Sequence, residues 1–130
     1  MDKKLKNRII QVLRRASYSS PERAAAKRKA RVAPATYRCN ICKNCFYEGK
    51  KDFESLVFEM ENVEPGKIHI DHLEPVVPLT GWISFDSFIT RLFCDEDNYQ
   101  IVCHECHTEK TKKEREERVR LRRSNENKNN

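Results

Sequence analysis

The stretches IHIDHLEP at residues 68–75 and DNYQIVCHECH at residues 97–107 decide the fold. In the first, isoleucines alternate with polar residues, which is typical of a β-strand with one face on a core. In the second, a short β-prone run at 99–103 leads into a charged segment that predicts a helix from about 105 to 122. Two strands and a long charged helix therefore form the expected centre of an α+β fold.

Other elements are predicted from periodicity and capping signals. Apolar residues recur at helical spacing in residues 1–15 and again in 85–93, where Ser84 is a suitable N-cap. Residues 22–33 contain good helix formers with little to bury, so we expect a basic helical arm that orders fully on a partner. Residues 53–60 alternate roughly between apolar and polar, which predicts a further strand.

The composition excludes several classes of protein. The 130 residues amount to one domain, with 38% hydrophobic and 35% charged residues. The longest uncharged run, residues 75–85, is far shorter than the roughly 20 residues that span a bilayer, so we expect no membrane association. The basic N-terminus leads into no apolar segment, which predicts that the protein is not secreted. Three glycines and no Gly-rich motif argue against a nucleotide-binding loop.

Charge is distributed unevenly along the chain. Residues 1–38 contain twelve Lys or Arg and two Asp or Glu; residues 39–102 contain five and twelve; residues 103–130 contain nine and six. The basic ends suit a polyanionic partner, and the acidic middle suits a divalent metal. The alternative is that these charges only solvate helix faces and disordered tails.

The cysteines indicate a structural metal site. Two C-x-x-C pairs are separated by 60 residues, and each pair can supply two of the four ligands of a tetrahedral zinc ion. Zinc bound by both pairs would tie distant segments together and would stabilise a small core. The predicted zinc ligands are Cys39, Cys42, Cys103 and Cys106.

Two alternatives to this zinc site stay open. The pairs could be disulfides, although nothing in the sequence points to an oxidising compartment. Cys42 and Cys45 form a rival C-x-x-C pair. In the preferred register, Cys45 and Cys94 are reduced and partly buried thiols.

A combination of motifs resembles the HNH endonuclease family. It comprises Asp-His at 71–72, Asn98 before a short strand, and CHECH at 103–107 followed by Lys110. The resemblance covers residues 37–112 and implies a ββα-metal fold with a four-cysteine zinc site. The wider sequence resembles small HNH proteins of bacteriophages. This domain would be flanked by a basic helical arm at 1–36 and by a charged helix extension with a polar tail at 113–130. Its long segment 46–66 departs from the shortest family members.

The resemblance implies a role for each motif residue. His72 is the expected general base, and Asn98 is expected to hold its imidazole through an oxygen atom. Asp71 and His107 are the expected ligands of a catalytic metal, which could be Mg²⁺, Mn²⁺, Ni²⁺ or Zn²⁺. Lys110 lies one helical turn beyond His107, so we expect it to contact phosphate.

Each of these roles has a structural alternative. His72 could be a structural histidine, and His107 could replace a cysteine at the zinc ion. Asn98 could merely shape the acidic turn that precedes it. His69, on the same strand face as Asp71, is a possible third metal ligand, and His104 is expected to be exposed.

The predicted function is metal-dependent nicking or cutting of DNA with little sequence specificity, in the cytoplasm of a bacterial host. The resemblance allows a role in phage genome packaging beside a terminase, or in homing. The alternatives are a zinc-stabilised nucleic-acid-binding module without catalysis, and an adaptor to a phage packaging motor. The basic residues expected to contact the DNA backbone, besides Lys110, are Arg14, Arg15, Lys27, Arg28, Lys29 and Arg31.

Overall fold

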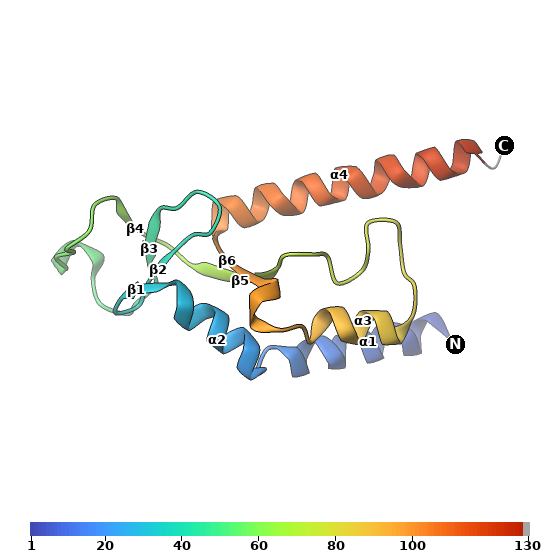
Figure 1. The fold of residues 1–130 in the computed structure, drawn as a ribbon, viewed down its shortest axis with the longest axis horizontal. Helices are drawn as coiled ribbons and strands as arrows, with labels where there is room; N and C mark the ends of the chain where they lie inside the picture. Colours follow the sequence, from blue (N-terminus) through green and yellow to red (C-terminus); the bar gives the residue numbers. More distant parts are fainter. Residues whose placement is uncertain (129–130) are drawn as a thin grey trace.

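The computed structural model describes residues 1–128 and has an α+β fold with four α-helices and two small sheets in that part of the chain. In chain order the elements are α1 (Lys3–Ser17), α2 (Pro21–Ala30), β1 (Arg31–Ala33), β2 (Thr36–Arg38), β3 (Cys45–Tyr47), the 3-10 helix η1 (Phe53–Ser55), β4 (Val63–Pro65), β5 (Ile68–His72), α3 (Phe85–Leu92), the 3-10 helix η2 (Glu96–Asn98), β6 (Tyr99–Cys103) and α4 (His104–Lys128). In Figure 1, β5 and β6 lie centrally, with α1 and α3 on one side and α4 on the other.

Strands β5 and β6 pair with each other although α3 and η2 lie between them in the chain. This antiparallel pair, called the β5–β6 hairpin below, is the centre of the fold. Its strands pair antiparallel over five positions, from Ile68 opposite Cys103 to His72 opposite Tyr99. Ile101, between the ends of β6, is almost completely buried. Helix α4 begins at the residue after β6 without a connecting loop. The two strands and the helix predicted from the sequence are therefore confirmed.

Helix α2 belongs to the core around this hairpin. Its Ala26 is buried against Ile68, Tyr99 and Ile101. A methyl side chain lets the helix backbone approach the strands closely, so a helix with a weak apolar face still packs well. The expectation that this helix has little to bury is therefore wrong, whereas its full ordering on a partner stays a prediction. The helix also ends earlier than expected, because residues 31–33 form strand β1.

A second part of the core joins α1 to α3. Phe88 and Leu92 of α3 are almost completely buried, and Ile10 and Leu13 of α1 pack against them. The Ser84 hydroxyl caps α3 by accepting a hydrogen bond from the Ser87 N–H at 3.1 Å, as the sequence predicts. Figure 1 shows α1 and α3 side by side. This packing fixes the end of α3, whose last carbonyl contacts the functional site.

The other sheet has the order β1-β2-β3-β4, with β4 parallel to β3. The strand predicted at residues 53–60 is wrong. That segment contains η1 and then irregular backbone, because Phe53 and Phe58 both pack toward Tyr47 instead of alternating between faces. The centroid of the Tyr47 ring lies 6.3 Å from that of Phe53 and 5.9 Å from that of Phe58.

Helix α4 is longer than the sequence indicates. It continues to Lys128, so residues 124–128, expected in a polar tail, are helical, while residues 129–130 lie outside the described part. The Arg118 side chain donates to the carbonyls of Val77 (2.7 Å) and Pro78 (2.9 Å), which ties the helix to the loop after β5. Within residues 1–128, no helix has the length and apolar character needed to cross a membrane.

Candidate functional site

The sulfur atoms of two distant C-x-x-C pairs converge at the start of α4. Each pair of ligand atoms in this cluster lies within 4.8 Å, and the Cys42 and Cys103 Sγ atoms are 4.0 Å apart. A tetrahedral zinc–thiolate site has sulfur atoms about 3.8 Å apart, so the cluster can accept a metal ion after small side-chain movements. The cluster consists of Cys39, Cys42, Cys103 and Cys106.

The other cysteines settle the register of the pairs. All six cysteines are free, so the disulfide alternative is not formed. Cys45 is buried in β3 and does not belong to the cluster, which excludes the rival pair of Cys42 with Cys45. His107 does not belong to the cluster, so the four cysteine sulfurs can supply all four tetrahedral ligands without a histidine.

Backbone groups prepare the cluster for a cation. Burial raises the pKa of the Cys39 thiol, but backbone hydrogen bonds, including the Cys103 N–H at 3.4 Å, outweigh this effect and lower the pKa to about 7. Burial and hydrogen bonds with the neighbouring thiols raise the pKa of Cys106. The cluster therefore combines one thiol that ionises easily with three thiols packed closely around it. A thiophilic divalent ion stabilises the thiolate form of such ligands.

Asn40 fastens the first cysteine pair to β6. Its backbone N–H donates to the Ile101 carbonyl at 2.7 Å, and its side-chain oxygen accepts from the Ile101 N–H at 2.6 Å. Lys43, with φ of 67°, turns the chain back so that its N–H donates to the Cys39 carbonyl at 3.0 Å. The sequence analysis missed Asn40, because an asparagine between two cysteines is also an ordinary turn residue.

A cleft of about 500 Å³ lies beside β5. Asp71, His72 and His107 line it, as does His69. A second hollow of about 360 Å³ shares Arg14, Asp71 and His72 with it and extends to α4. The structure thus brings together three of the four predicted catalytic and metal-ligating residues. The basic side chains around the first cleft are Arg14, Arg23, Lys27 and Lys67.

His72 is held by a backbone carbonyl at the end of α3. Its Nε2 lies 3.0 Å from the Leu92 oxygen, which can only accept, so Nε2 carries the proton and Nδ1 is the free acceptor of the neutral ring. Burial lowers the pKa of His72, against the opposing effect of the Leu92 carbonyl, and the Arg23 charge lowers it further. The ring therefore favours the neutral form, which is able to take a proton.

Asn98 does not contact the His72 ring through any hydrogen bond found in residues 1–128. It ends η2, it is exposed, and its carbonyl accepts from the Leu73 N–H at 2.8 Å. Asn98 and His72 do line a shared small hollow of about 150 Å³. The role of Leu92 could not be predicted from the sequence, because any residue type carries the same backbone carbonyl.

The Asp71 carboxylate is paired with Lys110. The Lys110 Nζ lies 2.6 Å from Asp71 Oδ2, 2.7 Å from the His72 carbonyl and 3.1 Å from Glu114 Oε1. Gln100 approaches the same Asp71 oxygen at 3.5 Å. The lysine expected to contact phosphate therefore neutralises the carboxylate expected to bind metal.

Three imidazoles lie next to one another near the start of α4. The rings of His69 and His107 are stacked at 4.5 Å between centroids, and His69 Nε2 lies 3.2 Å from Nδ1 of the exposed His104. Burial and the neighbouring His107 and His104 lower the pKa of His69. The His107 Nδ1 atom is buried and has no hydrogen-bond partner among the described residues. An unpartnered buried nitrogen is free to coordinate a cation.

Arg23 is a cleft residue that the sequence analysis missed. Its guanidinium donates to the Ile70 carbonyl at 3.1 Å and lies over the rings of Tyr18 (5.1 Å) and Tyr99 (5.9 Å). These contacts hold a positive charge beside His72. Nothing in the spacing of Arg23 distinguishes it from the other basic residues of its helix.

The six predicted backbone-contacting residues outside α4 fall into three groups. Arg14 and Lys27 line the cleft, although Lys27 is also paired with Glu48 at 2.5 Å. Lys29 is paired with Asp97 (3.1 Å) and Glu96 (3.2 Å). The remaining three are exposed and do not line the cleft: Arg15, Arg28 and Arg31.

A carboxylate, imidazoles and fixed cations around one cleft can bind a divalent ion and a phosphate group and can move a proton. No model of a protein family, no curated protein and no solved structure matches the chain. The function is therefore inferred from the side chains of the site.

Proposed function

We propose that the chain is a metal-dependent endonuclease of the HNH type, which hydrolyses DNA phosphodiester bonds in the cleft beside β5. One observation carries the proposal: Asp71, His72 and His107 come from separated stretches and line a single cleft with four basic side chains. The β5–β6 hairpin followed directly by α4 is compatible with the ββα arrangement of that family.

Two metal sites follow from the donor sets. A zinc ion held by the four cysteines would join the 39–42 turn to the start of α4. A second divalent ion would be held by Asp71, which already binds the Lys110 ammonium, and by His107, whose Nδ1 is unpartnered. When bound, this ion supplies stabilisation of the negative charge that develops on the phosphate and on the leaving oxygen.

His72 acts as the general base in this proposal. Its Nδ1 accepts a proton from the attacking water while Nε2–H remains bonded to the Leu92 carbonyl. The oxygen of that water bonds to phosphorus, and the bond from phosphorus to the 3′ oxygen breaks. The Leu92 carbonyl dipole stabilises the imidazolium that results, and its position keeps the ring oriented.

Cations of the cleft hold the substrate. Arg14, Arg23 and Lys67 can pair with phosphates, which are present in every DNA sequence. No base-reading helix was found in the sequence, so cleavage should depend on salt more than on sequence. A place in phage genome packaging beside a terminase, or in homing, and the bacterial cytoplasm as its location stay predictions.

A second candidate is a zinc-stabilised DNA-binding module without catalysis. The observation that favours it is the Lys110–Asp71 pair, which neutralises a proposed metal ligand. The same basic cleft would then serve for binding alone. The adaptor alternative has no specific contact in its favour at this cleft.

Cleavage of supercoiled plasmid separates these candidates. The full chain is incubated with Mg²⁺ or Mn²⁺, and nicked and linear products are measured beside DNA affinity. His72→Ala should reduce the cleavage rate at least about 100-fold, the usual contribution of a general base, while DNA affinity is kept. The control is Thr111→Ala, which removes an exposed side chain of α4 that does not line the cleft.

The control should cleave like the wild type. DNA binding without cleavage by the wild type in either metal would replace the nuclease by the binding module. Equal cleavage by the His72→Ala variant would remove His72 from the reaction.

A further inference from the structure

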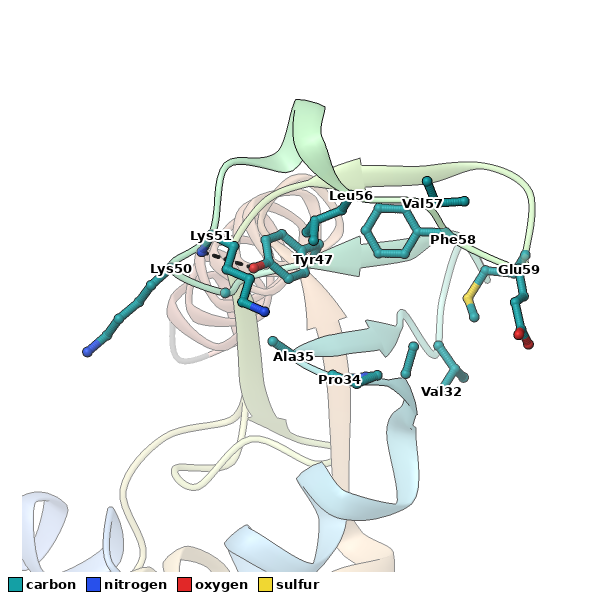
Figure 2. A pocket seen from close by; sticks show the side chains of 13 residues that line it. Val32, Pro34, Ala35, Tyr47, Lys50, Lys51, Leu56, Val57, Phe58 and Glu59 are labelled. Carbon is teal, nitrogen blue, oxygen red and sulfur yellow. Dashed lines mark hydrogen bonds between the residues drawn. The ribbon is translucent and has the colours of Figure 1, made fainter.

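A separate apolar pocket of about 730 Å³ lies at the sheet formed by β1 to β4 (Figure 2). Residues 32–35 form one wall, residues 56–60 form the other, and Tyr47 lies between them. None of its lining residues lines the cleft beside β5. The pocket therefore is not part of the proposed catalytic site.

The floor of the pocket is preformed. The buried Tyr47 ring packs against Phe58, and its hydroxyl accepts a hydrogen bond from the Lys51 N–H at 3.1 Å. Gly49 lies close to the hydroxyl end of this ring, because a Cβ at that position would overlap the tyrosine oxygen. These contacts fix the hollow in place without any occupant.

The walls expose apolar side chains. Val57 is 96% exposed and Val32 is 36% exposed. Both lie on the rim of an already apolar hollow, so together they form a continuous apolar surface and not scattered surface residues. Such a surface suits an apolar side chain of a partner.

The charges at the rim differ from one end to the other. Lys50 and Lys51 extend from one end, and Glu59 lies at the other end (Figure 2). Neither lysine belongs to an ion pair within residues 1–128, whereas Lys27 and Lys110 are paired with carboxylates. An occupant with negative charge toward the lysines is therefore complementary to this pocket.

We propose that this pocket binds a short segment of a partner protein that inserts one or two large apolar side chains and directs acidic residues toward Lys50 and Lys51. A nucleobase fits less well, because its polar edges need several hydrogen-bond partners and the side chains between the charged ends of the pocket are apolar apart from the Tyr47 hydroxyl, which already accepts from the Lys51 N–H. The Glu59 carboxylate would also repel a nucleic-acid backbone. The inference is independent of catalysis, and it gives the chain a protein-docking surface in addition to its proposed nuclease site.

Selection of peptides tests the pocket directly. Random twelve-residue peptides displayed on a carrier are selected on the immobilised full chain, and enriched peptides are then titrated in solution. Enriched peptides should contain large apolar residues flanked by Asp or Glu. Their affinity should fall at least about tenfold in Val57→Asp, because the new carboxylate interrupts the apolar rim that the peptide covers and would lose its hydration on binding. The control Ile83→Asp changes an apolar side chain that is 65% exposed outside the pocket and should bind like the wild type.

Charge reversal tests the acidic part of the proposal. The double variant Lys50→Glu with Lys51→Glu should enrich peptides with Lys or Arg in place of Asp or Glu. Lys112→Glu, an exposed position on α4, is the matched control and should keep the acidic preference.

Three results would overturn the inference. The first is the absence of enriched peptides, or enrichment that Val57→Asp leaves unchanged. The second is a labelled oligodeoxythymidylate whose binding falls in Val57→Asp but not in Ile83→Asp, which would give the pocket to nucleic acid. The third is a dimer in sedimentation that Val57→Asp dissociates, which would make the occupant a second copy. None of these results changes plasmid cleavage or its loss in His72→Ala.

Discussion

The two sheets of this protein are held together in different ways. The β5–β6 hairpin has two five-residue strands in full register and a four-cysteine cluster at its end. The β1–β4 sheet has three-residue strands, a register shift in β1 and an aromatic cluster around Tyr47. The hairpin can therefore carry polar groups such as Asp71 and His72, because a metal ion bound by the cysteines would supply stability that these polar side chains do not. The other sheet depends on apolar packing and leaves part of its apolar surface exposed.

Removal of one sulfur should break the first region completely. We expect Cys39→Ser to lose its zinc and to unfold, because structural zinc contributes roughly 10–16 kcal/mol while a whole domain is stable by only about 5–15 kcal/mol. Elemental analysis and thermal melting measure both effects. Cys94→Ser, which changes a half-buried thiol outside the cluster, should keep the metal. Zinc and melting temperature at wild-type levels in Cys39→Ser would mean that the cluster is not a metal site.

Asp71→Asn should separate chemistry from stability within the same hairpin. The amide keeps the shape of the carboxylate but removes its charge, so we expect plasmid cleavage to fall at least about 100-fold while the fold is retained. Cleavage rate and circular dichroism are the measurements, and Asp86→Asn on α3 is the control. Cleavage at the wild-type rate in Asp71→Asn would exclude Asp71 as a metal ligand.

Gly49→Ala should damage the second sheet alone. Because the added Cβ would overlap the Tyr47 ring, we expect a loss of about 1–3 kcal/mol in the free energy of unfolding, as for overpacking elsewhere. Denaturant titration measures the loss, and zinc content should not change. Gly81→Ala makes a poor control because φ at that position is 121°, so Lys50→Ala serves instead. A simultaneous loss of zinc would show that the two regions are coupled.

Asn40→Ala should have the smallest effect of the four substitutions, because it only weakens the connection between the first cysteine pair and β6. The substitution removes the 2.6 Å bond to the Ile101 N–H, which should cost about 1–2 kcal/mol of stability. Competition with a chelator should show faster zinc loss than in the control Asn44→Ala. Identical zinc release by the two variants would mean that the cysteines alone position this turn.

The elements that the sequence predicted are those with a strong local signal. The strands at 68–72 and 99–103 and the helix after Ser84 follow from periodicity and capping. The spacing of the cysteines predicted the two pairs, but only the structure excludes the rival pair of Cys42 with Cys45, which has the same spacing. The strand at 53–60 is wrong because alternation alone does not supply a pairing partner. The packing of α2 was missed because it depends on one small side chain, Ala26, meeting the hairpin.

The site was predictable to the extent that its residues carry motifs. Asp71, His72 and His107 were singled out from the sequence, and they line one cleft. The Leu92 carbonyl and the Arg23 guanidinium were not, because their roles depend on where α3 ends and on which face of α2 meets the hairpin. Tertiary packing decides both, and neither leaves a sequence pattern.

The position of Lys110 has a consequence for how the protein would respond to metal. Its ammonium contacts one of the two carboxylate oxygens of Asp71, the proposed metal ligand, and it is also held by Glu114. Under the proposed function, binding of a divalent ion at Asp71 would exchange one cation for another, so the measured metal affinity would report the difference between the two. The displaced lysine would stay bonded to Glu114 on α4 and would be available to an incoming phosphate, which would couple metal binding to substrate binding.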